Sequence, residues 1–122
     1  MKKVAVVDDS KLARVFARWA LASAKIEFLE IEPHSPESVL RALKDSCPDL
    51  LLLDVMMPGC PGLELFEAIR VDPVLQDLPV VLITAIGDES ILLPFVSLGI
   101  SGYIHKPVQA KALQEAVLAV LA

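Results

Sequence analysis

The sequence is poor in the features that mark secreted, zinc-binding or membrane proteins. It has only two cysteines, Cys47 and Cys60, which form no CxxC motif and have no histidine at ligand spacing, so neither a zinc site nor a redox pair is predicted. No apolar run approaches the ~20 residues of a membrane helix. The apolar run that follows Lys2 and Lys3 is too short for a signal peptide. We therefore expect a soluble, cytoplasmic protein without membrane contacts.

Positive charge is also in deficit. Eleven basic residues stand against sixteen acidic ones, which gives a net charge of -5 at pH 7. Such a chain repels a phosphate backbone, so we expect no direct nucleic-acid binding by this domain. The 122 residues are 55% hydrophobic, which is typical of one compact domain, and we expect it to span residues 1–122.

Short apolar runs alternate with segments of helical periodicity, which predicts an α/β fold. Continuous apolar runs at 4–7, 50–53 and 80–83 are typical of parallel strands covered by helices on both faces. The runs at 26–31 and 101–105 are broken by polar residues or short, so we place them at the sheet edges. With right-handed connections, these positions predict a doubly wound, five-stranded parallel sheet of order 2-1-3-4-5, a flavodoxin-like fold.

The first helix is predicted from one apolar stripe. Its members recur at helical spacing and are Leu12, Val15, Phe16, Trp19 and Ala20. We expect this stripe, including Trp19, to face the core. The basic residues Lys11, Arg14 and Arg18 lie off the stripe, and we expect them to be solvated.

Two further helices carry proline at informative positions. Ser35 followed by Pro36 predicts an N-cap and first residue of a second helix. A fourth helix is expected near residues 88–98, where Pro94 removes a backbone donor and should shorten or kink it. This segment has more apolar residues than one buried face needs, so we expect part of it to contact a dimer partner or an effector.

Polar residues follow the predicted strands at their carboxyl ends. They are Asp8, Asp9, Asp54, Thr84 and Lys106. Parallel strands bring these ends to one rim, next to the point where the strand order reverses. Three carboxylates in one place repel each other unless a cation joins them, and an all-oxygen ligand set suits Mg²⁺. Asp8, Asp9 and Asp54 therefore predict a metal site, with Lys106 as a second, fixed cation.

A metal, an ammonium group and a hydroxyl around an available carboxylate suit phosphoryl transfer. Thr84 and Lys106 could hold the phosphoryl oxygens while Asp54 attacks in line. The sequence has no glycine-rich phosphate loop and no Ser-His-Asp arrangement, so the donor should be a phosphorylated protein or a small phosphodonor rather than ATP. We also expect the Lys106-Pro107 bond to be cis.

Four motifs carry a family resemblance. They are VVDDSKLAR at 6–14, LLLLDVMMPGCPGLEL at 50–65, LITA at 82–85 and GYIHKP at 102–107. In this order and spacing they resemble the response-regulator receiver (CheY-like) family of two-component signalling, over nearly the whole chain.

The resemblance implies roles for the acidic residues. Asp54 would accept a phosphoryl group from the phosphohistidine of a sensor histidine kinase or a histidine phosphotransfer protein. Asp9 and Asp54 would bind Mg²⁺ directly with the Met56 backbone carbonyl, and Asp8 would act through water. The domain would be no enzyme in the usual sense, because it would catalyse only its own phosphorylation and dephosphorylation.

The resemblance also implies a switch. Thr84 and Lys106 would contact the phosphoryl group, and Tyr103 would turn inward as Thr84 moves. The segment 85–90 would change with it, and the surface of the fourth helix, fifth strand and fifth helix would engage an output domain or other downstream effector. A phosphorylation-dependent homodimer is a further candidate. The basic residues of the first helix are an alternative docking site for the kinase.

Two other function classes use parts of the same pattern. A receiver-like interaction module that is not phosphorylated would not need Asp54, Thr84 and Lys106, all of which are present. A Mg²⁺-dependent phosphohydrolase would need a second acid for the leaving group, and the sequence shows neither that acid nor a cap insertion. A phospho-accepting switch is the function that the sequence favours.

Overall fold

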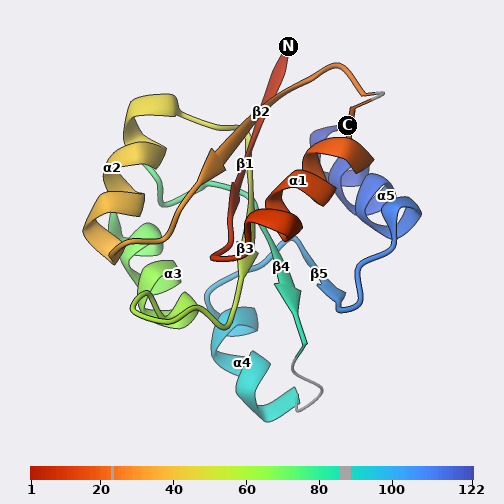
Figure 1. Cartoon of the computed structure of the whole chain (residues 1–122). Helices are drawn as coiled ribbons and strands as arrows, with labels where there is room; N and C mark the ends of the chain where they lie inside the picture. The colour runs from red at the N-terminus through yellow and green to blue at the C-terminus, as the bar shows by residue number, and fades with distance from the viewer. Residues whose placement is uncertain (23, 86–88) are drawn as a thin grey trace.

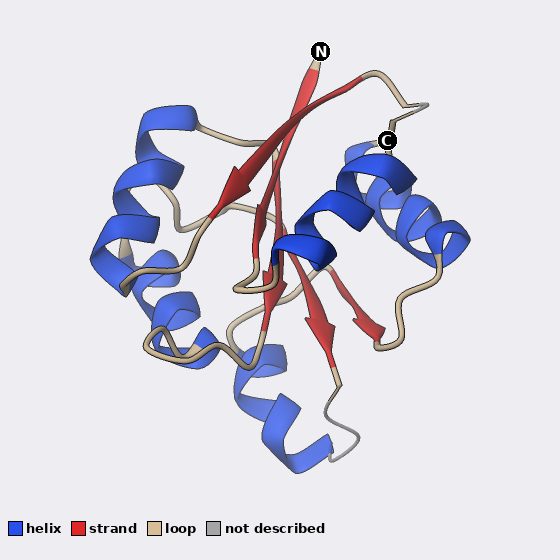
Figure 2. Ribbon diagram, in the orientation of Figure 1, coloured by secondary structure: helices blue, strands red, loops and turns tan. Residues whose placement is uncertain are grey.

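Strands and helices alternate along the chain in the computed structural model, which describes residues 1–22, 24–85 and 89–122 (Figures 1 and 2). The strands are β1 (Lys2–Val7), β2 (Ile26–Ile31), β3 (Leu50–Asp54), β4 (Val80–Thr84) and β5 (Gly102–His105). The helices are α1 (Lys11–Ala20), α2 (Pro36–Ser46), α3 (Gly62–Val71), α4 (Glu89–Ser97) and α5 (Ala110–Leu121). No helix in this described part of the chain combines the length and hydropathy that a membrane span requires.

The strands form one five-stranded parallel sheet in the order β2-β1-β3-β4-β5. The predicted fold class and strand order are therefore confirmed. Helices α1 and α5 cover one face, and α2, α3 and α4 cover the other (Figure 1). The register pairs Val7 with Leu53 and Asp54 with Ile83, so the strands end beside each other at one rim.

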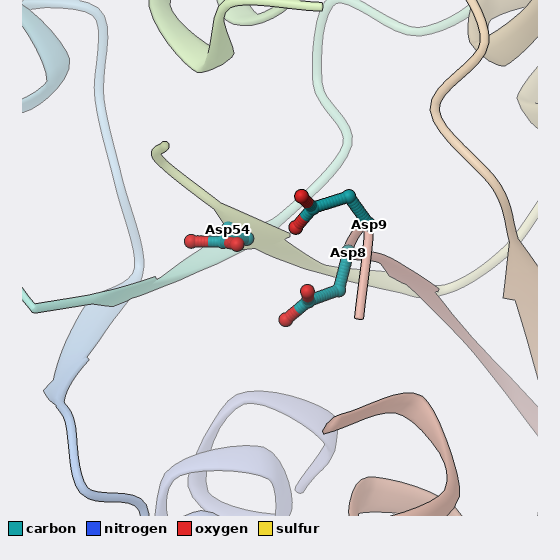
Figure 3. Close-up of side chains that lie close together, drawn as sticks. All are labelled: Asp8, Asp9 and Asp54. Carbon is teal, nitrogen blue, oxygen red and sulfur yellow. The ribbon is translucent and has the colours of Figure 1, made fainter. Parts of the chain in front are cut away.

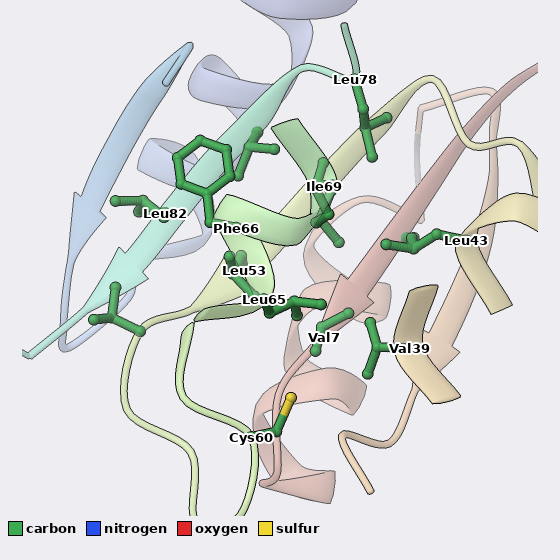
Figure 4. Close-up of a cluster of buried hydrophobic side chains, with 14 of the residues drawn as sticks. Val7, Val39, Leu43, Leu53, Cys60, Leu65, Phe66, Ile69, Leu78 and Leu82 are labelled. Atoms are coloured by element: carbon green, nitrogen blue, oxygen red, sulfur yellow. The ribbon is translucent and has the colours of Figure 1, made fainter. Parts of the chain in front are cut away.

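The core has two parts, one on each face of the sheet. The side chains of β3 alternate between these two parts. Leu51 and Leu53 pack towards α2 and α3, and Leu50 and Leu52 pack towards α1 and α5. Figure 4 shows the first part, in which Leu53 lies near Leu65 and Phe66 of α3. Burial of one such side chain contributes about 1.5–3 kcal/mol to folding. The strands nearest the rim are thus held from both faces.

Helix α1 is rotated relative to the prediction from the sequence. Trp19 is 67% exposed and Leu12 is 79% exposed, whereas Arg14, Ala17 and Ala20 are buried. The expectation that the apolar stripe faces the core is therefore wrong for Leu12, Val15 and Trp19, whereas Ala20 is buried and Phe16 packs, partly buried, against the core. The small alanine side chains let the helix approach the sheet closely, and the buried Arg14 has polar partners there. Leu12, Val15 and Trp19 are left at the surface, and the Trp19 ring lies 5.9 Å from the partly buried Phe16 ring.

The prolines of α2 and α4 have different effects. Ser35 is the N-cap of α2 and accepts from the Ser38 N–H, and Pro36 is the first helical residue, as predicted. Pro94 lies inside α4, which continues to Ser97, so it does not end the helix. The expected fourth helix and the loop before it include residues 86–88, which lie outside the described residues.

Candidate functional site

Three carboxylates meet at the carboxyl ends of β1 and β3. Asp54 is the last residue of β3, and Asp8 and Asp9 directly follow β1. Each offers one oxygen atom, and these three atoms all lie within 4.8 Å of one another. Figure 3 shows the side chains of Asp8 and Asp9 beside Asp54. The structure therefore brings together the three acids that the sequence predicted to meet.

The cluster concentrates negative charge in a largely buried place. Asp8 and Asp54 are only 2% and 3% exposed, and Asp9 is exposed. Burial raises the pKa of Asp8 to about 6, and repulsion by Asp54 and Asp9 adds to this. The Ser10 N–H, which donates to Asp8 Oδ1 at 2.9 Å, and the Lys106 ammonium act in the opposite direction. An additional cation would relieve this repulsion, and the oxygen donors fit Mg²⁺.

Lys106 supplies a fixed positive charge at the same rim. Its Nζ lies 3.5 Å from Asp54 Oδ1, and its backbone N–H donates to the Thr84 carbonyl at 2.7 Å. The Lys106-Pro107 bond is cis, which confirms the prediction. Thr84 ends β4 and is fully buried. Both residues therefore lie at the strand ends from which Asp54 can be approached.

The segment after Asp54 is held tightly. The Met56 N–H donates to Asp54 Oδ1 at 3.3 Å, and its side chain is exposed. Gly62, the first residue of α3, donates from its N–H to the Val55 carbonyl at 3.2 Å. A Cβ at position 62 would lie 2.7 Å from that carbonyl oxygen, which is closer than packing allows. Gly62 is a supporting residue that our sequence reasoning missed, although a glycine just before an apolar helical pattern was the available signal.

Tyr103 lies on β5, three positions before Lys106 in the sequence. It is 58% exposed and borders a cavity of about 180 Å³. The other lining residues come from β4, α4 and the segment before β5: Leu82, Leu92, Leu93, Val96 and Ile100. The aromatic side chain therefore has an apolar cavity next to it.

A second cavity, of about 340 Å³, connects the rim with α1. Asp8 and Lys106 line it together with Leu12 and Phe16 of α1 and Val108, which follows the cis proline. The site is thus continuous with an apolar surface. The sequence did not predict this surface, because it assigned the large residues of α1 to the core.

Comparison with known proteins gives the family. The model of the response regulator receiver domain matches residues 4–118, so the chain belongs to the response regulator receiver family. It is 34% identical over 120 residues to the phosphate regulon transcriptional regulatory protein PhoB of Pseudomonas aeruginosa, covering 98% of this chain and 52% of that protein. It is 32% identical over 111 residues to the cyclic di-GMP phosphodiesterase response regulator RpfG of Xanthomonas campestris, covering 91% of this chain and 29% of that protein.

The fold is also that of a solved chemotaxis protein. The structure of CheY4 of Vibrio cholerae superposes with a TM-score of 0.87 at 24% identity, covering 98% of each chain. The chain spans about half the length of the PhoB relatives that it matches. Its family and acidic site identify it as a phospho-accepting receiver domain of two-component response regulators. The family is one of signalling domains and not of conventional enzymes.

Proposed function

We propose that Asp54 is the phosphoacceptor. The observation that carries this proposal is its position: a buried carboxylate at a strand end, 3.5 Å from the Lys106 ammonium and next to two more acids. In the transfer, an Asp54 oxygen forms a bond to phosphorus while the bond between phosphorus and the imidazole nitrogen of the donor breaks. The imidazole leaves with that electron pair. We propose that the receiver domain extends over residues 1–122.

Asp9, Asp54 and the Met56 backbone carbonyl would hold Mg²⁺, with Asp8 acting through water. When bound, Mg²⁺ neutralises charge on the phosphoryl oxygens, which is the main requirement of phosphoryl transfer. The Ser10 N–H orients the Asp8 carboxylate, and the Met56 N–H orients that of Asp54. The chain's own contribution is therefore to fix the directions of these acids before the donor arrives.

Lys106 and Thr84 would hold the transferred group. The ammonium of Lys106 can shift from the Asp54 oxygen to a phosphoryl oxygen nearby, and the Thr84 hydroxyl can donate to another. Both side chains come from strand ends that are anchored to each other by the bond between the Lys106 N–H and the Thr84 carbonyl. The same groups would stabilise attack by water on the phosphorylated Asp54, so the domain would also catalyse its own dephosphorylation.

The experiment that tests Asp54 is phosphorylation with phosphoramidate and Mg²⁺, followed by mass spectrometry of the intact protein and its peptides. We expect one phosphate on Asp54, none on Asp54→Ala, and unchanged labelling of Asp45→Ala. Asp45 is a matched control because it is an exposed aspartate on α2. An unmodified wild-type protein would support an interaction module instead. Multiple turnover of small phosphate esters would support a phosphohydrolase.

We propose that the phosphodonor is a sensor histidine kinase or a histidine phosphotransfer protein and that it docks on α1. The imidazole must come within bonding distance of Asp54, so the donor has to cover the rim beside α1. There, Leu12 and Trp19 are 79% and 67% exposed, and the apolar cavity next to Leu12 leads to Asp8 and Lys106. Arg18, beside Trp19, is half exposed and pairs with Glu30 at 3.0 Å, which gives this surface a polar edge. Such a surface suits an apolar helical partner with a polar border.

Trp19→Ala separates docking from chemistry. In this variant we expect unchanged labelling by phosphoramidate. Transfer from a phosphohistidine protein should be about 10-fold slower, because large aromatic residues that become buried in an interface often dominate binding. Val71→Ala is the control, since Val71 is 80% exposed on α3 and lies on the opposite face of the sheet. Equal slowing by both variants would contradict docking on α1.

We propose that the output surface consists of α4, β5 and α5. Ile91, Leu93 and Val96 of α4 are 48%, 59% and 53% exposed, and Tyr103 of β5 lies next to this helix. Phosphorylation would change this surface and so engage an output domain, another effector or a second copy of the domain. We place the whole exchange in the cytoplasm, where Cys47 and Cys60 stay reduced.

A further inference from the structure

Arg14 is a buried cation on α1 that the phosphoryl-transfer chemistry does not use. The residue is only 5% exposed, although its position in the sequence suggested a solvated face. Its Nη1 donates to the Asp8 carbonyl at 2.6 Å. Its other nitrogens reach two acids at the end of β2: Nε lies 3.4 Å from Glu30 Oε1, and Nη2 lies 3.5 Å from Glu32 Oε1. The side chain therefore links the end of β2 to the chain at Asp8.

The carbonyl that Arg14 holds belongs to the peptide group between Asp8 and Asp9. Rotation of this peptide group would change the directions of the Asp8 and Asp9 side chains. The Asp8 carboxylate is fixed separately by the Ser10 N–H at 2.9 Å, but no group among the described residues forms a hydrogen bond or ion pair with the exposed Asp9 carboxylate. The direction of Asp9 thus depends on the backbone that Arg14 anchors.

The form of the Arg14 side chain suits this task. Its planar fork of donors can bond a carbonyl on one side and carboxylates on the other at the same time, which a lysine ammonium does less well. Its charge is paired with Glu30 and Glu32, and its hydrogen bond at the site goes to a carbonyl and not to a carboxylate. Arg14 therefore acts on the acidic cluster through geometry.

We infer that Arg14 is a positioning residue that sets the Mg²⁺ affinity of the acidic cluster by holding the Asp8–Asp9 peptide group. This inference rests on the proposed function, because it takes Asp8, Asp9 and Asp54 as the metal site. Residues that orient metal ligands from behind commonly change metal affinity 10- to 100-fold when they are replaced.

The test compares Arg14→Lys with Arg18→Ala. Arg18 shares Glu30 at 3.0 Å but is half exposed, and no bond to Asp8 is recorded for it among the described residues. Calorimetric titration with Mg²⁺ alone should show a dissociation constant about 10-fold higher for Arg14→Lys and within about twofold of wild type for Arg18→Ala. Hydrogen exchange of the metal-free proteins should show faster exchange of the Asp9 and Ser10 amides in Arg14→Lys only.

The outcomes separate the possible roles. Equal Mg²⁺ affinity of Arg14→Lys and wild type, with a lower free energy of unfolding, would overturn the inference and leave Arg14 a structural residue. A wild-type protein that binds no Mg²⁺ would instead contradict the proposed function. If Arg14→Lys does not fold, Glu30→Gln weakens the same anchor and keeps Arg14. It should raise the Mg²⁺ dissociation constant in the same direction, and an unchanged constant would overturn the inference.

Discussion

The Lys106 ammonium lies 3.5 Å from the Asp54 carboxylate, although Asp54 ends β3 and Lys106 directly follows β5. Asp54 is buried, and the side chain of Lys106 is one-third exposed. The ammonium is therefore close enough to pair with the acid and open enough to move onto an incoming group. In the metal-free protein it offsets part of the negative charge of the cluster.

Replacement of Lys106 should separate metal binding from phosphoryl transfer. In Lys106→Ala we expect a Mg²⁺ dissociation constant about threefold lower, because a cation next to the metal site is removed. We expect phosphorylation by phosphoramidate to be slower by about 10-fold or more, because the developing charge loses a donor. Titration calorimetry and mass spectrometry measure the two effects. Lys111→Ala, at an exposed position of α5, should change neither, and slower labelling in both variants would refute the role of Lys106.

The raised pKa of Asp8 predicts how stability depends on pH. In the folded, metal-free protein the pKa is about 6, against 3.8 for the free side chain. Between these pH values the folded state binds a proton that the unfolded state has released, so protonation of Asp8 favours the folded state. This contribution to the free energy of unfolding is complete at low pH and is lost as the pH rises to ~6. It amounts to roughly 2–3 kcal/mol.

Urea unfolding in the presence of a chelator, from pH ~4 to ~7, measures this contribution. The free energy of unfolding of wild type should fall relative to that of Asp8→Asn across this range. Asp45→Asn, at an exposed position on α2, should follow the wild-type curve. Parallel curves for wild type and Asp8→Asn would show that the pKa of Asp8 is not raised.

Gly62 should tolerate no side chain. In Gly62→Ala the new Cβ would lie 2.7 Å from the Val55 carbonyl oxygen, so the start of α3 must move away from the end of β3. We expect a loss of roughly 1–3 kcal/mol in the free energy of unfolding, together with slower labelling of the neighbouring Asp54. Gly102→Ala is the matched control, because no atom lies within 4 Å of a Cβ there. Equal loss in both variants would mean that the close approach at Gly62 is not the cause.

The sequence was sufficient for the sheet and for the acidic cluster. Apolar runs of strand length were buried on both faces as expected, and the order of the strands then determined that Asp8 and Asp54 end at the same rim. The strand order follows from burial, which is visible in the pattern of apolar residues, and from the general right-handedness of parallel strand connections. The family motifs gave the same residues independently.

The side of α1 that faces the sheet could not be read from the sequence in this way. Trp19 is larger and more apolar than Ala17, yet Ala17 is buried and Trp19 is exposed. The choice depends on how closely the helix approaches the sheet and on the acids of β2 that pair with Arg14. Both are tertiary features, because Glu30 and Glu32 are far from Arg14 along the chain. The space next to Gly62 likewise depends on the backbone of another element.

Loading of the site should move Tyr103. A ligand shifts a two-state protein only by its different affinity for the two states. A phosphoryl group on Asp54 would accept a hydrogen bond from the Thr84 hydroxyl at the end of β4, next to β5. Tyr103 is 58% exposed beside an apolar cavity of about 180 Å³, so inward rotation would bury its ring. Residues 89–104 should then change their exposure, and Pro94, which donates no backbone hydrogen bond inside α4, should make this segment open more easily.

Tyr103 is the single tyrosine of the chain, so incorporated 3-fluorotyrosine reports on it alone. Beryllofluoride with Mg²⁺ should shift its fluorine resonance in wild type and not in Asp54→Ala, and hydrogen exchange should change over residues 89–104 more than in α2. Because α2 packs against α3 and lies away from β5 (Figure 1), it serves as the internal reference. A resonance that stays in place while Asp54 is loaded, or an equal change in α2, would show that the signal leaves the site by another route than Tyr103 and α4.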